Sequence, residues 1–178
     1  MRQVALIRGV NVGRAKRVAM ADLRALVEEL GCSEVRTLLN SGNVVFGTRA
    51  PAAKVAARIE KALVAQLGVT ARVTVLTAAE LAVAVEQNPL LDVADDPSRL
   101  LVAVLKDPAD RIRLKGLTNE SWAPEAVAVG KRVAYLWCPA GVLASRLPEA
   151  VGRALGDRVT TRNWSTITKL HAMAQDRR

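Results

Sequence analysis

Aromatic residues are scarce in this chain of 178 residues, in which one Phe, one Tyr and three Trp make up 3% of the sequence. So few rings leave little material for a platform on which nucleic-acid bases could stack. The chain has two cysteines, Cys32 and Cys138, and a single histidine, His171. Two thiols cannot build a disulfide framework, and one histidine excludes a histidine-pair metal site. We therefore expect no metal, no other cofactor and a reduced, cytoplasmic protein.

Long hydrophobic runs are also missing. No stretch approaches the ~18 apolar residues that a membrane-spanning helix needs. The apolar run between Arg2 and Arg8 is too short for a signal peptide, so we expect no association with a membrane. Apolar residues still make up 51% of the chain, which predicts a globular fold, but 30 Ala and 24 Val account for much of that share. Because small side chains bury little area each, the core is expected to be lean.

Acidic residues are outnumbered, with 17 Asp and Glu against 26 Lys and Arg, a net charge of +9. Such a field attracts phosphate-bearing partners, either nucleic acid or a small molecule. The charge is spread evenly, because residues 1–90 carry 12 basic and 7 acidic residues and residues 91–178 carry 14 and 10. An even spread is equally typical of a chain whose composition is basic throughout. The sequence leaves open which of these two explanations applies.

The hydrophobic pattern of the first half predicts the order β-α-β-β-α-β-α. A Gly-containing loop follows the first strand, and Asn40 to Asn43 have the composition of a hairpin turn. Pro51 and Gly68 stand where a helix begins and ends, with Ala52, Ala56, Ile59, Leu63 and Leu67 on its buried face. The expected elements are strands at 4–8, 35–39, 44–46 and 69–76, and helices at about 20–30, 51–68 and 77–85.

The same order repeats after a polar connector at 88–97. Pro148 predicts a break or a late start in one of the helices of this second half. The expected elements are strands at 100–105, 126–129, 133–137 and 158–161, and helices at 108–117, 142–155 and 165–174. Two copies of β-α-β-β-α-β predict an α+β fold of duplicated ferredoxin-like (split βαβ) halves with antiparallel or mixed sheets. We place these halves at 1–87 and 98–178.

Three motifs resemble a known family. They are Arg-Gly-Val-Asn-Val-Gly at 8–13, Ser-Gly-Asn-Val-Val-Phe at 41–46, and Thr-Arg-Asn-Trp-Ser-Thr-Ile-Thr-Lys-Leu at 161–170. Together they closely resemble the bacterial family called domain of unknown function 1697, and the match runs from the first strand to the last helix. The resemblance implies an α+β fold of two related ferredoxin-like halves. It implies no activity, since none is established for the family.

The loop after the first strand is the first candidate site. It carries cations without an acidic residue among them, and its glycines leave backbone N–H groups accessible. Such a loop would suit an anion, although its spacing matches neither a Walker A loop nor the dinucleotide-binding fingerprint. The alternative is that Gly9 and Gly13 only permit a tight turn. The candidate ligands are Arg8, Asn11, Gly13, Arg14 and Lys16.

The second candidate site is the start of the last helix. Asn163, Thr166 and Lys169 could supply donors to the second side of a ligand. The alternative is structural, with Asn163 as the helix N-cap and Trp164 as a buried anchor. If the two halves face each other, the two candidate sites could line one cleft.

These observations lead to one hypothesis of function and two alternatives. The hypothesis is an uncharacterised protein that binds a phosphate-bearing ligand, nucleic acid or nucleotide, at the loop after the first strand. An enzyme acting on a small anionic metabolite between the halves would need a carboxylate in a deep pocket, and Asp22 or Glu34 are the candidates. A protein-interaction module would instead expose Trp122 and Trp137 as an apolar patch. Whether any reaction is catalysed stays open.

Overall fold

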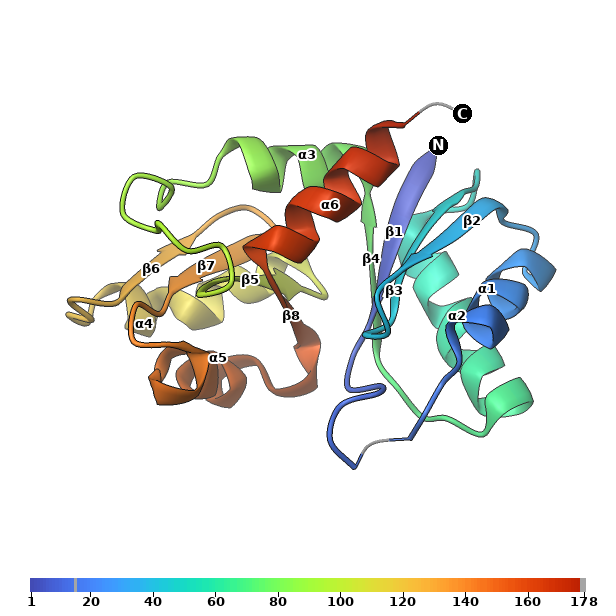
Figure 1. The fold of residues 1–178 in the computed structure, drawn as a ribbon, viewed down its shortest axis with the longest axis horizontal. Coiled ribbons are helices and arrows are strands. Elements are labelled where there is room, and N and C mark those ends of the chain that lie inside the picture. The colour runs from blue at the N-terminus through green and yellow to red at the C-terminus, as the bar shows by residue number, and fades with distance from the viewer. Residues whose placement is uncertain (15, 177–178) are drawn as a thin grey trace. The chain divides into compact units, whose positions relative to one another are not determined.

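The computed structural model describes residues 1–14 and 16–176 and contains, within them, two antiparallel sheets of four strands each (Figure 1). The strand orders are β2-β3-β1-β4 and β6-β7-β5-β8. In both sheets the first strand of the repeat lies between the third and the fourth, which is the split βαβ arrangement. The predicted α+β fold of two similar halves is therefore confirmed.

Contacts between Cα atoms divide the chain into two compact units. The first unit is Met1–Leu81 together with Leu170–Arg178, and the second is Ala82–Lys169. The two boundaries fall inside helices, α3 (Ala78–Glu86) and α6 (Trp164–Gln175). A capping box begins α3, because the Thr77 hydroxyl accepts from the Glu80 N–H at 3.1 Å and the Glu80 carboxylate accepts from the Thr77 N–H at 2.9 Å.

The sheet of the first unit consists of β1 (Arg2–Ile7), β2 (Ser33–Leu38), β3 (Asn43–Gly47) and β4 (Val73–Thr77). Its last strand begins at Val73 and not at Val69, where the sequence predicted it. The reason lies in the helix before it, since Gly68 adopts the left-handed conformation and the Val69 N–H donates to the Leu63 carbonyl at 3.1 Å. Val69 therefore belongs to the end of that helix.

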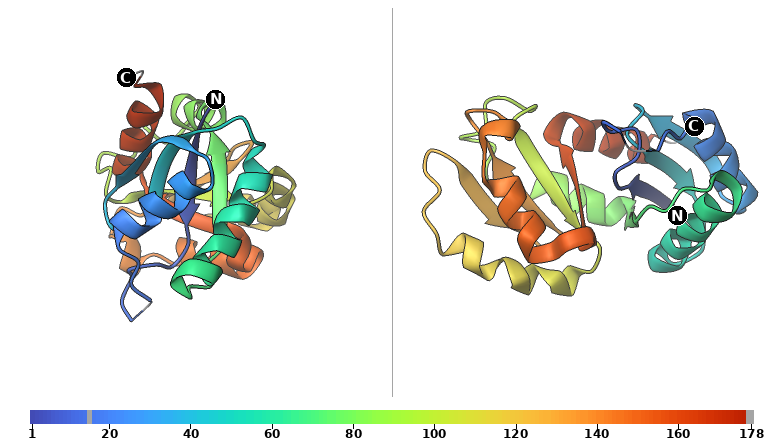
Figure 2. Two further views of the ribbon diagram at one scale, coloured as in Figure 1. Left: turned by 90° about the vertical axis from the view of Figure 1, so that its right-hand side faces the viewer. Right: turned by 90° about the horizontal axis from the view of Figure 1, so that it is seen from below.

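Two helices cover one face of this sheet, α1 (Met20–Glu29) and α2 (Ala52–Leu67), as Figures 1 and 2 show. The buried side chains of α2 are Val55, Ala56, Ile59, Ala62 and Leu63. Ala52 and Leu67, which the sequence placed on the buried face, are only partly buried. Burying one side chain such as Ile59 contributes about 1.5–3 kcal/mol to the free energy of unfolding.

The sheet of the second unit consists of β5 (Leu100–Leu105), β6 (Ala126–Val129), β7 (Val133–Trp137) and β8 (Val159–Asn163). A 3₁₀ helix η1 (Pro108–Leu114), a short helix α4 (Lys115–Thr118) and α5 (Leu147–Leu155) pack on one face of it (Figure 2). Pro148 lies in the first turn of α5, after a separate 3₁₀ turn at Val142–Ala144. This confirms the predicted late start.

The last turn of α6 is bound by two arginines of the first sheet. Nη1 of Arg2 donates to the Met173 carbonyl at 3.3 Å, and Nη2 of Arg36 donates to the same oxygen at 2.5 Å. Arg36 also pairs with Asp176 at 3.2 Å. Guanidinium groups at the carboxyl end of a helix satisfy its free carbonyls and interact favourably with its dipole.

In the described ranges, no helix has both the length and the apolar character needed to cross a membrane.

Candidate functional site

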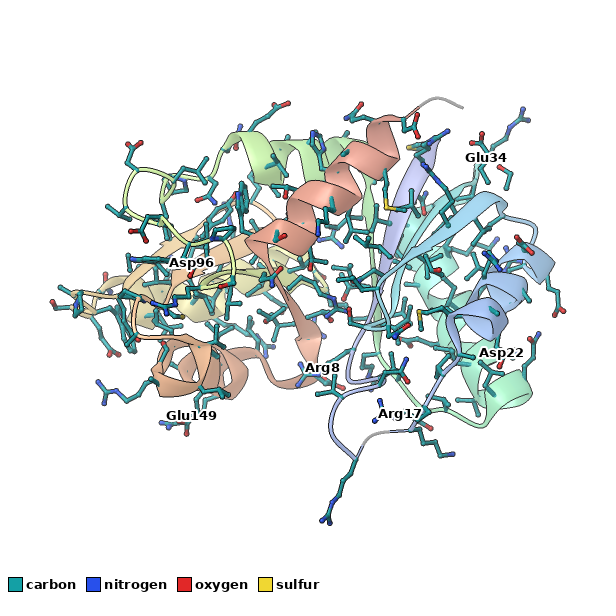
Figure 3. All side chains as sticks on the ribbon, viewed as in Figure 1. Arg8, Arg17, Asp22, Glu34, Asp96 and Glu149 are labelled. Atoms are coloured by element: carbon teal, nitrogen blue, oxygen red, sulfur yellow. The ribbon has the colours of Figure 1, made fainter. Side chains whose placement is uncertain are left out.

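The loop between β1 and α1 carries the predicted anion-binding residues. Its first N–H group, that of Arg8, donates to the Arg72 carbonyl at 2.9 Å, so the pairing of β1 with its neighbour continues one residue past the strand. Gly9 and Gly13 both have positive φ, of 71° and 54°. Both therefore sit where a side chain would be strained. Figure 3 places Arg8 and Arg17 at the same end of the first sheet.

Asn11 holds this loop together. Its backbone has φ 56°, and its side-chain Nδ2 donates to the carbonyls of Val18 at 2.8 Å and of Asn40 at 2.7 Å. Its Oδ1 accepts from the Val18 N–H at 2.8 Å. Both amide hydrogens are thus donated within the protein, so Asn11 shapes the loop and joins it to the β2–β3 turn. Its place among the ligand contacts stays a prediction.

The cations of the loop differ in what they touch. Lys16 Nζ donates to the Gly68 carbonyl at the end of α2, and Arg17 Nη1 donates to the Asn11 carbonyl at 3.2 Å. Arg14 is exposed. In the described part of the chain, no carboxylate forms an ion pair with Arg14, Lys16 or Arg17. Three positive charges at this end of the sheet are therefore not neutralised by an acidic neighbour.

The helix after the loop begins where the sequence predicted it, several residues beyond the candidate ligands. α1 starts only at Met20, and its N-cap Ala19 offers no side-chain hydrogen bond. Gly13 and Arg14 therefore do not stand at a helix N-terminus. Any anion bound beside them would be held by loop N–H groups and cationic side chains, without the help of a helix dipole.

The second group of predicted residues lies at the start of α6. Asn163 is the last residue of β8, and its Oδ1 accepts from the Thr166 N–H at 2.9 Å, as the structural alternative expected of an N-cap. The Thr166 side chain is buried, whereas Lys169 is exposed. Next to them, burial lowers the pKa of Arg162 to about 10. Of these three predicted residues, Thr166 is buried, Asn163 is half-buried and Lys169 is exposed.

The aromatic side chains form no exposed surface. Phe46, Tyr135 and Trp137 are buried, and Trp122 is half-buried with its indole N–H donating to the Leu117 carbonyl at 2.8 Å. The expectation that Trp122 and Trp137 form an exposed apolar patch is therefore wrong. Both rings serve the packing of the second unit. A nucleic acid would likewise find no stacking platform on β3 or β7.

The two carboxylates proposed for an enzyme have different surroundings. Asp22 is exposed on α1, and Figure 3 shows it on the outer side of that helix. Glu34 lines a hollow of about 820 Å³ at the start of β2, where it pairs with Arg2 at 2.9 Å. Its backbone has φ 50° at a break in the pairing of β2 with β3. The ion pair gives Glu34 a structural partner in Arg2.

The thiols and the metal-ligating residues show no reactive cluster. Cys32 and Cys138 are buried, and burial raises the pKa of both thiols. Within the two described ranges, no three His, Cys, Asp or Glu side chains gather closely enough to hold a metal ion.

A third cationic position was not singled out in the sequence. Arg111 and Lys115 line a hollow of about 430 Å³ in the second unit. The signal available was the basic character of the helix predicted at 108–117. The hollow forms only because Val129 and Gly130, at the β6–β7 turn, line it together with these two cations. No sequence pattern shows that these segments lie close together.

Comparison with known proteins shows the family to which the chain belongs. Residues 1–135 match the family described as "Protein of unknown function (DUF1697)". The chain belongs to this family. No curated protein matches it.

One solved structure is similar over nearly the whole length. It is that of the conserved bacterial protein SP0830 from Streptococcus pneumoniae, with 21% sequence identity, a TM-score of 0.79 and 98% coverage of both chains. At this identity the similarity shows a shared fold.

Proposed function

We propose that the protein binds a phosphate-bearing ligand, either a nucleic acid or a nucleotide, at the loop between β1 and α1. Arg8, Arg14 and Lys16 meet the phosphate oxygens, while Asn11 and Gly13 give the loop its shape.

The observation that carries this proposal is the set of cations without acidic partners. In the ranges that the structure describes, Arg14, Lys16 and Arg17 have no carboxylate within ion-pair distance. Charges left in this state repel one another and are stabilised by an anion. The left-handed conformations of Gly9, Asn11 and Gly13 fix the turns of the loop, which supports the same proposal.

The buried aromatic residues favour one mode of nucleic-acid binding within this proposal. Because Phe46, Tyr135 and Trp137 are covered, base stacking on either sheet is not available to a ligand. Contacts to phosphate groups would then dominate, so binding would have little sequence preference and a steep dependence on salt.

The test is the binding of a fluorescein-labelled oligothymidylate, followed by fluorescence anisotropy over a series of salt concentrations. We expect binding at low salt that weakens steeply as salt rises. Arg14→Gln should weaken it about threefold to tenfold and reduce the slope of log affinity against log salt by about one.

Arg24→Gln is the matched control. Arg24 is an exposed arginine of α1, so the substitution removes the same charge from the same unit without touching the loop. Its effect should be less than twofold. Equal losses from Arg14→Gln and Arg24→Gln, or no binding by the unsubstituted protein at low salt, would refute the loop as the site.

A further inference from the structure

The second unit contains a hollow that the loop proposal does not use. It has a volume of about 430 Å³ and lies where helices η1 and α4 meet the edge strand β6 and the turn that follows it. This volume is in the range of about 300–1,000 Å³ that is typical of small-molecule sites. The lining residues that matter here are Arg111, Ile112, Lys115, Thr118, Val129 and Gly130.

The cations of this short helical segment fall into two kinds. Arg113 pairs with the buried carboxylate of Asp110 at 3.5 Å, and Arg158 pairs with the same carboxylate at 2.8 Å. In the described part of the chain, by contrast, the side chains of Arg111 and Lys115 form neither an ion pair nor a hydrogen bond. These two cations are the ones that line the hollow, and no carboxylate is among its lining residues.

The remaining lining is mostly apolar or already satisfied. The Thr118 hydroxyl donates to the Lys115 carbonyl at 2.9 Å, and the Gly130 N–H donates to the Val133 carbonyl at 2.7 Å. Val129 is half-buried, and the Ile112 side chain is 61% exposed. The hollow therefore has two cations in its lining, with the apolar side chains of Ile112 and Val129 beside them.

We infer that this hollow binds a small organic phosphate. The phosphate group lies between Arg111 and Lys115, and the apolar or aromatic part of the ester rests on Ile112 and Val129. An aromatic ester such as a nucleoside monophosphate combines the two chemistries in one small molecule. This site is separate from the loop after β1 and does not depend on the function proposed for that loop.

The probe for the test is adenosine 5′-monophosphate that carries an N-methylanthraniloyl fluorophore on its ribose. We expect saturable binding at low salt, and competition by unlabelled adenosine 5′-monophosphate but not by adenosine. Arg111→Gln and Lys115→Gln should each weaken binding about tenfold, because each removes a charge-assisted contact to the phosphate. Inorganic phosphate should also displace the probe. Ile112→Asn should weaken the binding of the nucleotide but leave the affinity for inorganic phosphate unchanged.

The matched control is Arg113→Gln, a loss of the same charge from the same helix at a residue that does not line the hollow. It should change the affinity less than twofold, and circular dichroism should show all four variants folded, since all four positions are exposed. Three results would each overturn the inference. They are an equal loss from Arg113→Gln and Arg111→Gln, displacement of the probe by adenosine, and loss of binding through Arg14→Gln alone.

Discussion

The side chain of Asn11 and the backbone of Val18 form a reciprocal pair of hydrogen bonds, each 2.8 Å long. The amide of the side chain here takes the place of a peptide group, because it donates to the Val18 carbonyl and accepts from the Val18 N–H. With its second donor on the Asn40 carbonyl, one residue closes the loop after β1 and connects it to the neighbouring turn. The shape of the proposed phosphate site depends on this residue.

Asn11→Ala should lower the free energy of unfolding by about 2–3 kcal/mol. The substitution removes three hydrogen bonds, leaves the part-buried N–H and carbonyl of Val18 without these partners, and places alanine at φ 56°, where asparagine is better tolerated. Denaturant unfolding followed by circular dichroism measures the change. Asn40→Ala is the control, because Asn40 contributes its backbone carbonyl to Asn11 and its side chain forms no hydrogen bond with the described residues. It should cost less than about 0.5 kcal/mol.

Gly42→Ala should cost about 2 kcal/mol or more in the same measurement. Gly42 has φ 79°, and a Cβ there would lie 2.8 Å from Val10 Cγ2 and 2.9 Å from Ile7 Cβ. These neighbours belong to β1 and its loop, so the clash would push the β2–β3 turn away from the candidate site. Gly116→Ala provides the comparison, since Gly116 lies in α4 with open space around it and should gain up to about 1 kcal/mol. A neutral Gly42→Ala would contradict the close approach.

Tyr135 is the single tyrosine of the chain, so its ionisation can be followed alone. Its hydroxyl donates to the Ala84 carbonyl at 2.7 Å, and burial raises its pKa to about 12 from the usual 10. A pKa raised by folding means that the buried neutral phenol contributes stability in full below about pH 10. This contribution is lost as the pH rises from about 10 to about 12.

The ultraviolet absorbance of tyrosinate should therefore appear only above pH 11 in the folded protein, and near pH 10 in denaturant. Tyr135→Phe should remove the loss in the free energy of unfolding between about pH 10 and pH 12. A native titration near pH 10 would show that the phenol reaches solvent.

The two thiols should react with Ellman's reagent far more slowly in the native protein than in the unfolded chain. Both are buried, and burial raises their pKa, so little thiolate is present and little of it is accessible. Reaction rates measured across a denaturant series should rise together with unfolding. The variants Cys32→Ser and Cys138→Ser show which thiol accounts for which part of the reaction. A thiol that reacts rapidly without denaturant would contradict its burial.

Most of the fold could be predicted from local patterns. Strands β5, β6 and β7 have the predicted limits, because each is an apolar run bounded by polar or turn-forming residues. The start of β4 was misplaced because Val69 follows a helix-ending glycine and is apolar whether it ends the helix or begins a strand. On α2 the buried face is turned toward Val55 and Ala62, a rotation that depends on how α1 packs beside it.

The site was less accessible to prediction. The cations of the loop were visible as residue types, but the role of Asn11 depends on partners at Val18 and Asn40, which only the folded chain brings close. The hollow at Arg111 and Lys115 was missed for the same reason. Its walls come from a helix and from a turn that are separated in the sequence, and an unpaired charge is not distinguishable from a paired one without coordinates.

The two sheets share one strand order, yet the connection after the first strand of each repeat spans residues 8–19 in one unit and 106–107 in the other. The same strand pairing therefore accommodates two connections of very different length. The same freedom is available to the protein engineer. The connection at 8–19 can be shortened to the length of its counterpart, or inserted between Leu105 and Pro108. Such variants would test whether ligand binding can be removed or moved while the protein still folds.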